Sequence, residues 1–126
     1  MFTGCKSQPN EEVYISDFYN IHEEYKDAWG NVGKYDISLP YIHCDSKSAK
    51  KLNQTIKSEY KGLIDSLDEA KEEGYTLPDT KVSYDVYTHS NLLSLVIKEE
   101  VETEYPRYKV YHFDSKTKKR VSNKKL

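Results

Sequence analysis

Hydrophobic residues between positions 45 and 78 recur at intervals of three and four, the spacing of one face of an amphipathic helix. The members of this stripe are Ala49, Leu52, Ile56, Tyr60, Leu63, Leu67 and Ala70. Asp45 or Ser46 would begin the helix, because either side chain can accept hydrogen bonds from the free amides of the first turn. Gly74 would end it in a left-handed conformation, and Pro78 would prevent its continuation.

On both sides of this helix, hydrophobic and polar residues alternate with the period of β-strands. The predicted strands cover residues 13–25 and 35–41 before the helix, and 82–86, 92–101 and 108–112 after it, with 120–122 as the start of a further strand. Pro40 lacks a backbone donor, which places its segment at a sheet edge or at a strand end. The expected fold class is α+β: one long helix packed on an antiparallel sheet of about five strands, in the order β-β-α-β-β-β.

A chain of 126 residues has room for one domain of ordinary size. We expect residues 1–12 to form a disordered tether and residues 13–126 to form a single α+β domain. Lys and Arg total 19 and Asp and Glu total 21, so the net charge of −2 argues against a general polyanion-binding protein. Six basic residues gather within positions 116–125, and we expect a solvated or envelope-facing patch there rather than a nucleic-acid surface.

The first five residues, MFTGC, resemble the end of a bacterial lipoprotein signal, in which the cysteine becomes the lipidated first residue of the mature protein. Cys5 is therefore a lipidation candidate, and a lipid anchor would attach the protein to a membrane only if Cys5 is modified. The basic and hydrophobic regions of such a signal are missing, so either the chain starts late or the match is accidental. No stretch approaches the roughly 20 apolar residues that span a bilayer.

Several short motifs occur in a characteristic order along residues 35–122. They are ISLPYI at 37–42, the pair Leu52-Asn53 at the start of the helix, VSYDV at 82–86, LSLVI at 93–97 and YHFDSKTKK at 111–119. In this order they resemble a bacterial extracytoplasmic domain of unknown function. That domain precedes the catalytic domain of PdaC-type peptidoglycan deacetylases, and it also occurs in the anti-sigma factor RsiV and in small lipoproteins. Lys118 departs from the pattern, because the family often has glycine in this turn.

The resemblance implies an extracytoplasmic protein that is membrane-anchored or associated with the cell envelope. It does not carry over deacetylation, because no catalytic domain follows in this chain. Lysozyme binding in RsiV-like proteins involves a longer region, so that activity is not carried over either. A cell-wall glycan or an envelope protein, a lysozyme-like protein included, is the expected partner; the oligomeric state stays open.

Motifs for catalysis and cofactor binding are missing from the sequence. The four histidines, His22, His43, His89 and His112, lie in different predicted elements without the close pairing of metal ligands. No nucleophile elbow and no phosphate-binding glycine loop occurs, so we expect no cofactor and no metal. Paired carboxylates such as Glu99 and Glu100 are expected to be solvated and to have unshifted acidity.

Twelve tyrosines against three phenylalanines and one tryptophan are the most unusual feature of the composition. The strand and helix periods predict that Tyr35, Tyr41, Tyr60 and Tyr84 point into the core. The expected exposed aromatics are Tyr14, Tyr25, Tyr87, Tyr105, Tyr111 and Trp29. Exposed Tyr and Trp are typical of recognition surfaces, and the binding candidates among them are Trp29, Tyr87 and Tyr105.

Together these observations favour a non-catalytic cell-envelope domain, lipoprotein-like, that binds a protein or a cell-wall glycan. The alternative is a small hydrolase or transferase with a cryptic site near His43, Cys44 and Asp45. A third interpretation is a structural subunit that associates through an edge strand, because Pro40 protects only one edge.

Overall fold

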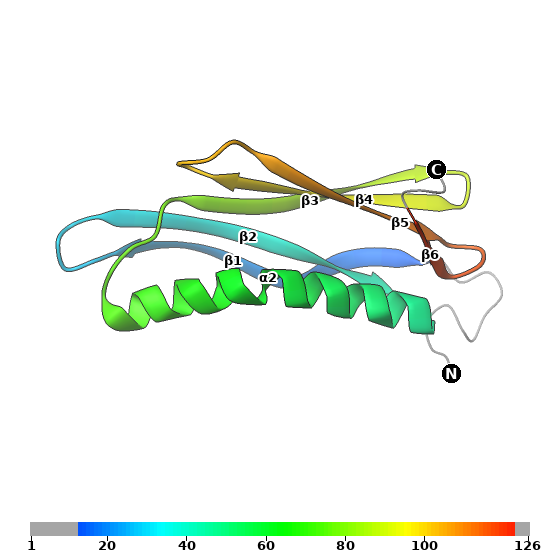
Figure 1. The fold of residues 1–126 in the computed structure, drawn as a ribbon, viewed down its shortest axis with the longest axis horizontal. Coiled ribbons are helices and arrows are strands. Elements are labelled where there is room, and N and C mark those ends of the chain that lie inside the picture. Colours follow the sequence, from blue (N-terminus) through cyan, green and yellow to red (C-terminus); the bar gives the residue numbers. More distant parts are fainter. Residues whose placement is uncertain (1–12, 123–126) are drawn as a thin grey trace.

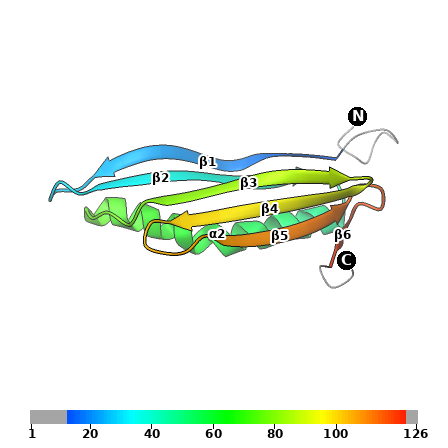
Figure 2. The ribbon, with the colours of Figure 1, turned by 90° about the horizontal axis from the view of Figure 1, so that it is seen from above.

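The computed structural model describes residues 13–122, which form one six-stranded sheet with a single long helix along one of its faces (Figures 1 and 2). The elements are β1 (Tyr14–Lys26), β2 (Val32–His43), α2 (Lys47–Glu73), β3 (Thr80–His89), β4 (Leu92–Val101), β5 (Arg107–Asp114) and β6 (Lys119–Val121). The strands lie side by side in chain order, β1-β2-β3-β4-β5-β6. The predicted α+β class and the order of strands and helix are confirmed, with six strands rather than about five.

The sheet is mixed, and the prediction of an antiparallel sheet is wrong at its centre. Strands β2 and β3 are parallel and pair only over residues 35–37 and 80–82, whereas every other neighbouring pair is antiparallel. The reason is the helix: α2 returns the chain along the sheet, so β3 starts at the same end as β2 and runs in the same direction. The two antiparallel parts of the sheet are therefore joined by a short parallel seam.

Both predicted ends of the helix are confirmed. The Oγ of Ser46 accepts a hydrogen bond from the Ala49 amide at 3.1 Å, which satisfies one of the free donors of the first turn. Gly74 adopts the left-handed conformation with φ of 84°, and its amide donates to the Ala70 carbonyl at 2.9 Å. The stripe predicted from the sequence is the buried face, where six members of the stripe are buried and Leu63 is half-buried.

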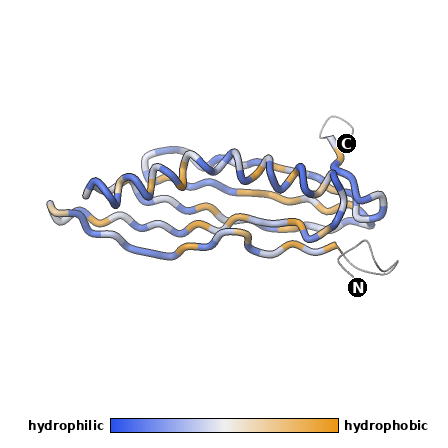
Figure 3. Tube along the Cα trace, turned by 90° about the horizontal axis from the view of Figure 1, so that it is seen from below, coloured by the Kyte–Doolittle hydropathy of each residue, from blue (hydrophilic) through white to orange (hydrophobic). Residues whose placement is uncertain are grey.

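The core lies between α2 and the sheet face that it covers. Alternate strand positions contribute to it, so hydrophobic and hydrophilic stretches follow one another along the chain (Figure 3). The largest fully buried side chains are Tyr35, Phe113, Ile37, Leu39, Ile42, Leu52, Ile56, Leu67, Leu95, Ile97 and Val82. Tyr35 and Tyr60 are buried as predicted, and Tyr84 is half-buried against the same cluster.

A β-bulge in the first hairpin changes which side chains enter the core. Asp17 pairs with Pro40 and Tyr19 with Leu39, which leaves Phe18 as the extra residue without a partner on β2. The alternation of buried residues on β2 breaks at the same point, so that Ile42 rather than Tyr41 is buried. The prediction that Tyr41 points into the core is therefore wrong: it is half-buried beside Phe18, because the bulge rotates this end of the hairpin.

Beyond residue 37, β2 pairs with β1 alone, and a helix side chain takes over the hydrogen bonds that β3 does not supply. The Oδ1 of Asn53 accepts from the Ile42 amide at 2.8 Å, and its Nδ2 donates to the Ile42 carbonyl at 3.0 Å. This pairing satisfies two backbone groups that would otherwise lie unpaired next to the core. Pro40 lies in the same stretch, which agrees with its prediction at a sheet edge or strand end.

Lys118, in the turn that leads into β6, adopts a left-handed conformation with φ of 60°. Its amide donates to the Asp114 carbonyl at 2.7 Å. Glycine adopts this conformation without steric cost, whereas the Cβ of a residue such as Lys118 makes it less favourable.

Candidate functional site

The three aromatic residues singled out from the sequence are all exposed, but they lie in different places. Trp29, in the β1–β2 turn, is 76% exposed, and Tyr105, in the β4–β5 turn, is 92% exposed. Both turns lie at one end of the elongated sheet, whereas Tyr87, 59% exposed, is close to the β3–β4 turn at the other end (Figure 1). These residues therefore do not form a single surface.

Two other tyrosines predicted to be exposed contact the helix instead. Tyr111 is buried, and its hydroxyl donates a hydrogen bond to the Oε1 of Glu59 on α2. Tyr25 is half-buried, with its hydroxyl 3.3 Å from the Lys71 carbonyl. The prediction for Tyr111 fails because Tyr111 and Phe113, not Tyr108 and Val110, occupy the helix-facing positions of β5.

A buried carboxylate at the helix–sheet interface is a second correction. Glu99 was expected to be solvated, yet its side chain is only 10% exposed and its Oε2 accepts a 2.5 Å hydrogen bond from the Tyr60 hydroxyl. Lys109 Nζ lies 3.4 Å from the same oxygen, and Arg107 Nη2 lies 3.3 Å from Oε1. Lys109 also lies over the Tyr60 ring, 4.6 Å from its centroid. The carboxylate is buried because the position of Glu99 on β4 faces α2, and its charge is balanced by these donors.

This polar cluster changes the acidity of its tyrosines. Burial, together with the hydrogen bond to Glu99, raises the pKa of Tyr60 far above its usual value. Burial and the hydrogen bond to Glu59 likewise raise the pKa of Tyr111. Both hydroxyls thus stay protonated donors throughout the physiological range, and the cluster holds α2 against β4 and β5. It has the character of a structural network rather than of an acid–base site.

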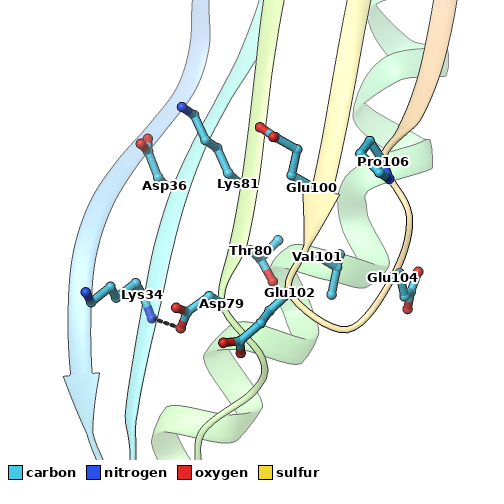
Figure 4. A pocket seen from close by; sticks show the side chains of 10 residues that line it. All are labelled: Lys34, Asp36, Asp79, Thr80, Lys81, Glu100, Val101, Glu102, Glu104 and Pro106. Atoms are coloured by element: carbon cyan, nitrogen blue, oxygen red, sulfur yellow. Dashed lines mark hydrogen bonds between the residues drawn. The ribbon is translucent and has the colours of Figure 1, made fainter.

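A large pocket opens at the end of the sheet where β2, β3 and β4 meet the β4–β5 turn (Figure 4). Its volume is about 480 Å³, and ten residues line it: Lys34, Asp36, Asp79, Thr80, Lys81, Glu100, Val101, Glu102, Glu104 and Pro106. Five of these are carboxylates and two are lysines, so the pocket is negative. The Lys34 amide donates to Asp79 Oδ1 at 2.9 Å, which places Asp79 as a structural acceptor at this end of β2.

A second pocket, which we call the hairpin–helix pocket, lies between the first hairpin and α2. Its volume is about 370 Å³, and its lining residues are Phe18, Tyr41, Lys50, Asn53, Gln54 and Lys57. Phe18 and Tyr41 form one side, with ring centroids 6.0 Å apart and an angle of 23° between the ring planes. The volume lies within the range of ligand pockets, and the lining combines two aromatic rings with amide and ammonium groups.

The helix supplies the polar side of the hairpin–helix pocket. Lys50, Gln54 and Lys57 follow one another at intervals of four and three, so they share one face of α2. Lys57 Nζ lies 5.5 Å from the centroid of the Phe18 ring, within the distance of a cation–π contact. Sequence reasoning missed this site, although the adjacent aromatics Phe18 and Tyr19, which interrupt the strand alternation, are a signal of the bulge that builds it.

The residues of the alternative enzymatic interpretation have separate partners. The His43 ring stacks on Tyr14 with centroids 4.3 Å apart, and its Nε2 lies 2.6 Å from Ser16 Oγ. Asp45 lies 3.1 Å from Lys50 Nζ, and Cys44 is buried between β2 and the helix. None of His43, Cys44 and Asp45 lines the hairpin–helix pocket or the negative pocket.

Residues 13–122 hold no cluster of metal ligands and no helix that could span a membrane. Among residues 13–122, no three side chains of His, Cys, Asp or Glu converge as metal ligands would. The one helix of this part is too polar to cross a lipid bilayer. Cys5, the lipidation candidate, and the predicted tether of residues 1–12 lie outside the described residues.

The chain matches no known protein-family model. A search of the curated proteins also finds no match.

Proposed function

We propose that this protein is a non-catalytic domain of the bacterial cell envelope that binds a cell-wall glycan, and that the hairpin–helix pocket is its binding site. The observation that carries the proposal is the pairing of two neighbouring aromatic rings with amide and ammonium groups across one pocket. Aromatic rings can stack on the apolar faces of sugar rings, while amides and lysines hydrogen-bond to hydroxyl groups.

Two residues of the pocket are held in place by the fold, which lowers the conformational entropy that a ligand must remove on binding. Asn53 is held by two hydrogen bonds to the β2 backbone, and Phe18 is the extra residue of a bulge. Bulges occur where a strand redirects a side chain, and here the redirected ring stands opposite the polar face of the helix.

The envelope location rests on the sequence. The order of motifs along residues 35–122 resembles an extracytoplasmic domain, and the context of Cys5 resembles a lipoprotein signal. Lipidation of Cys5 would hold the domain at the membrane. An envelope protein is the other partner class, and the exposed aromatics that would contact it are Trp29 and Tyr105 at one end of the sheet or Tyr87 at the other.

Co-sedimentation with insoluble peptidoglycan tests the proposal and separates the two surfaces. Phe18→Ala should abolish retention, because it removes the exposed ring of the pocket. Tyr87→Ala, which removes a ring of comparable exposure at the other end of the sheet, is the matched control and should be retained like the wild type. Absence of wild-type sedimentation, or loss caused by Tyr87→Ala but not by Phe18→Ala, would sink the proposal.

A further inference from the structure

We infer that the ligand of the hairpin–helix pocket is an acidic sugar, whose ring stacks on Phe18 while its carboxylate or phosphate group lies against Lys57 and Lys50. This inference rests on the proposed function and adds the charge and orientation of the ligand. It is carried by the distribution of charge around the pocket together with the placement of its aromatic rings.

The lining of the pocket is positive although the whole chain is slightly negative. Of its six lining residues two are lysines and none is acidic. The negative pocket at the end of the sheet is the opposite, with five carboxylates and two lysines. A cleft lined by one sign of charge raises the local concentration of ligands of the other sign, so the hairpin–helix pocket favours an anion.

Lys57 is the cation best placed for this anion. Within residues 13–122 it has no carboxylate partner, and its contact is the Phe18 ring at 5.5 Å. The next lysine along the same helix, Lys61, is paired with Asp65 at 2.6 Å. Lys50 stands about two turns nearer the start of the helix and is held 3.1 Å from Asp45. The ammonium group of Lys57 is thus available to an incoming anion, and Lys50 supports it from the other side of Gln54.

The rings set how a sugar would lie. Phe18 is 44% exposed, with the Lys57 ammonium group 5.5 Å from its ring centroid, whereas Tyr41 beside it is half-buried. A pyranose stacked on the exposed ring would place its hydroxyl groups toward the Gln54 carboxamide, which has no side-chain hydrogen-bond partner among the described residues. Asn53 has less capacity for this role, because one donor and one acceptor site of its carboxamide are already bonded to Ile42.

NMR titration of the uniformly ¹⁵N-labelled protein tests the inference with three sugars that differ only at C6: glucose, glucuronate and glucose 6-phosphate. Both acidic sugars should shift the amide resonances of residues around Phe18 and Gln54 and should bind two- to fivefold more tightly than glucose at low ionic strength, the scale of one exposed charge contact. The advantage should shrink in 0.5 M sodium chloride, because salt screens exposed charges. The glucuronate and phosphate arms distinguish the two kinds of anion.

Two variants of matched charge locate the effect. Lys57→Gln should lower the affinity for the acidic sugars to that for glucose, while Lys61→Gln should leave the preference intact. Phe18→Ala should weaken the binding of all three sugars. The same spectra show whether each variant is folded, and acetate and inorganic phosphate, titrated alone, show what the anion contributes without a sugar ring.

The outcomes separate this inference from the proposed function. Equal affinity for glucose and for both acidic sugars would overturn the inference and leave glycan binding standing. The same shifts at the same concentrations of acetate or inorganic phosphate alone would overturn it as well, because the ring would contribute nothing. Acidic-sugar shifts at residues away from the pocket, or unchanged preference in Lys57→Gln, would also refute it. Failure of the proposed function is recognised independently, by the absence of peptidoglycan sedimentation.

Discussion

Replacing Tyr60 by phenylalanine removes a single hydroxyl group from the interface between α2 and the sheet. Tyr60 is 3% exposed, and its hydroxyl donates to Glu99 Oε2 at 2.5 Å. Phenylalanine keeps the ring and its packing, so the perturbation is confined to one hydrogen bond with a charged, buried acceptor. Glu99 keeps Lys109 and Arg107 as partners, which prevents the loss of the whole cluster.

At neutral pH we expect Tyr60→Phe to lower the free energy of unfolding by about 2 kcal/mol, the scale of a hydrogen bond to a charged group. Above pH 10 the difference should shrink. Burial and the hydrogen bond to Glu99 raise the pKa of Tyr60 in the folded protein, so the unfolded tyrosine loses its proton first. The unfolded state then binds fewer protons than the folded one, and wild-type stability falls with rising pH.

The variant lacks this titration. Above pH 10 its free energy of unfolding should therefore fall less steeply than that of the wild type, and the two slopes should differ by about 1.4 kcal/mol per pH unit. The two curves should converge near pH 11.5, since a gap of about 2 kcal/mol closes at that slope within about 1.5 units above pH 10. Urea unfolding followed by circular dichroism between pH 7 and pH 11.5 measures both free energies. Tyr105→Phe, at a side chain that is 92% exposed, is the control and should follow the wild type. A gap that stays constant over this range would refute the reasoning, because it would mean that folding does not change the acidity of Tyr60.

Three further changes test how the hairpin is held. Asn53→Ala should lower the free energy of unfolding by about 1–3 kcal/mol in urea melts, because it leaves two backbone groups of β2 unpaired; a loss below 0.5 kcal/mol would show that water replaces the amide. Gly33→Ala should destabilise by about 1–3 kcal/mol, since its Cβ would stand 2.3 Å from the Tyr35 hydroxyl, and a neutral effect would contradict this crowding. Asp27 accepts hydrogen bonds within the β1–β2 turn; burial opposes its ionised form, but these bonds outweigh burial and lower its pKa. Asp27→Ala should therefore be less stable than the wild type at pH 7, and this difference in stability should vanish as the pH falls below the usual carboxyl range. Thermal melts from pH 7 to pH 2 measure it. A difference in stability that does not change with pH would argue against a lowered pKa of Asp27.

Local patterns in the sequence were sufficient for the helix and for most strands. The caps at Ser46 and Gly74 and the buried stripe of α2 depend on residues within a few positions of one another, so periodicity and side-chain chemistry predict them. The same holds for the positions of the strands, and for the exposure of Trp29, Tyr87 and Tyr105.

The features that depend on pairing between distant segments were not predictable in this way. The bulge at Phe18 is defined by its register with Pro40, and it decides that Ile42 is buried and that Tyr41 lines a pocket. A shift by one residue moves every following side chain to the other face, and the alternation of a strand does not reveal which partner absorbs the extra residue. The hairpin–helix pocket is a consequence of this shift.

Glu99 shows the same division between local and tertiary information. Its neighbours in the sequence are mostly charged and predict a solvated strand end. Its position on β4 nevertheless faces α2, where the hydrogen bond from Tyr60 and the charge of Lys109 offset the desolvation cost of the buried carboxylate. The sequence by itself determined the elements, their order and the amphipathic face of the helix, because these follow from interactions within a few residues. Only the tertiary structure decided the parallel seam, the bulge, the buried carboxylate and the pocket, because each depends on the register between segments that are distant along the chain.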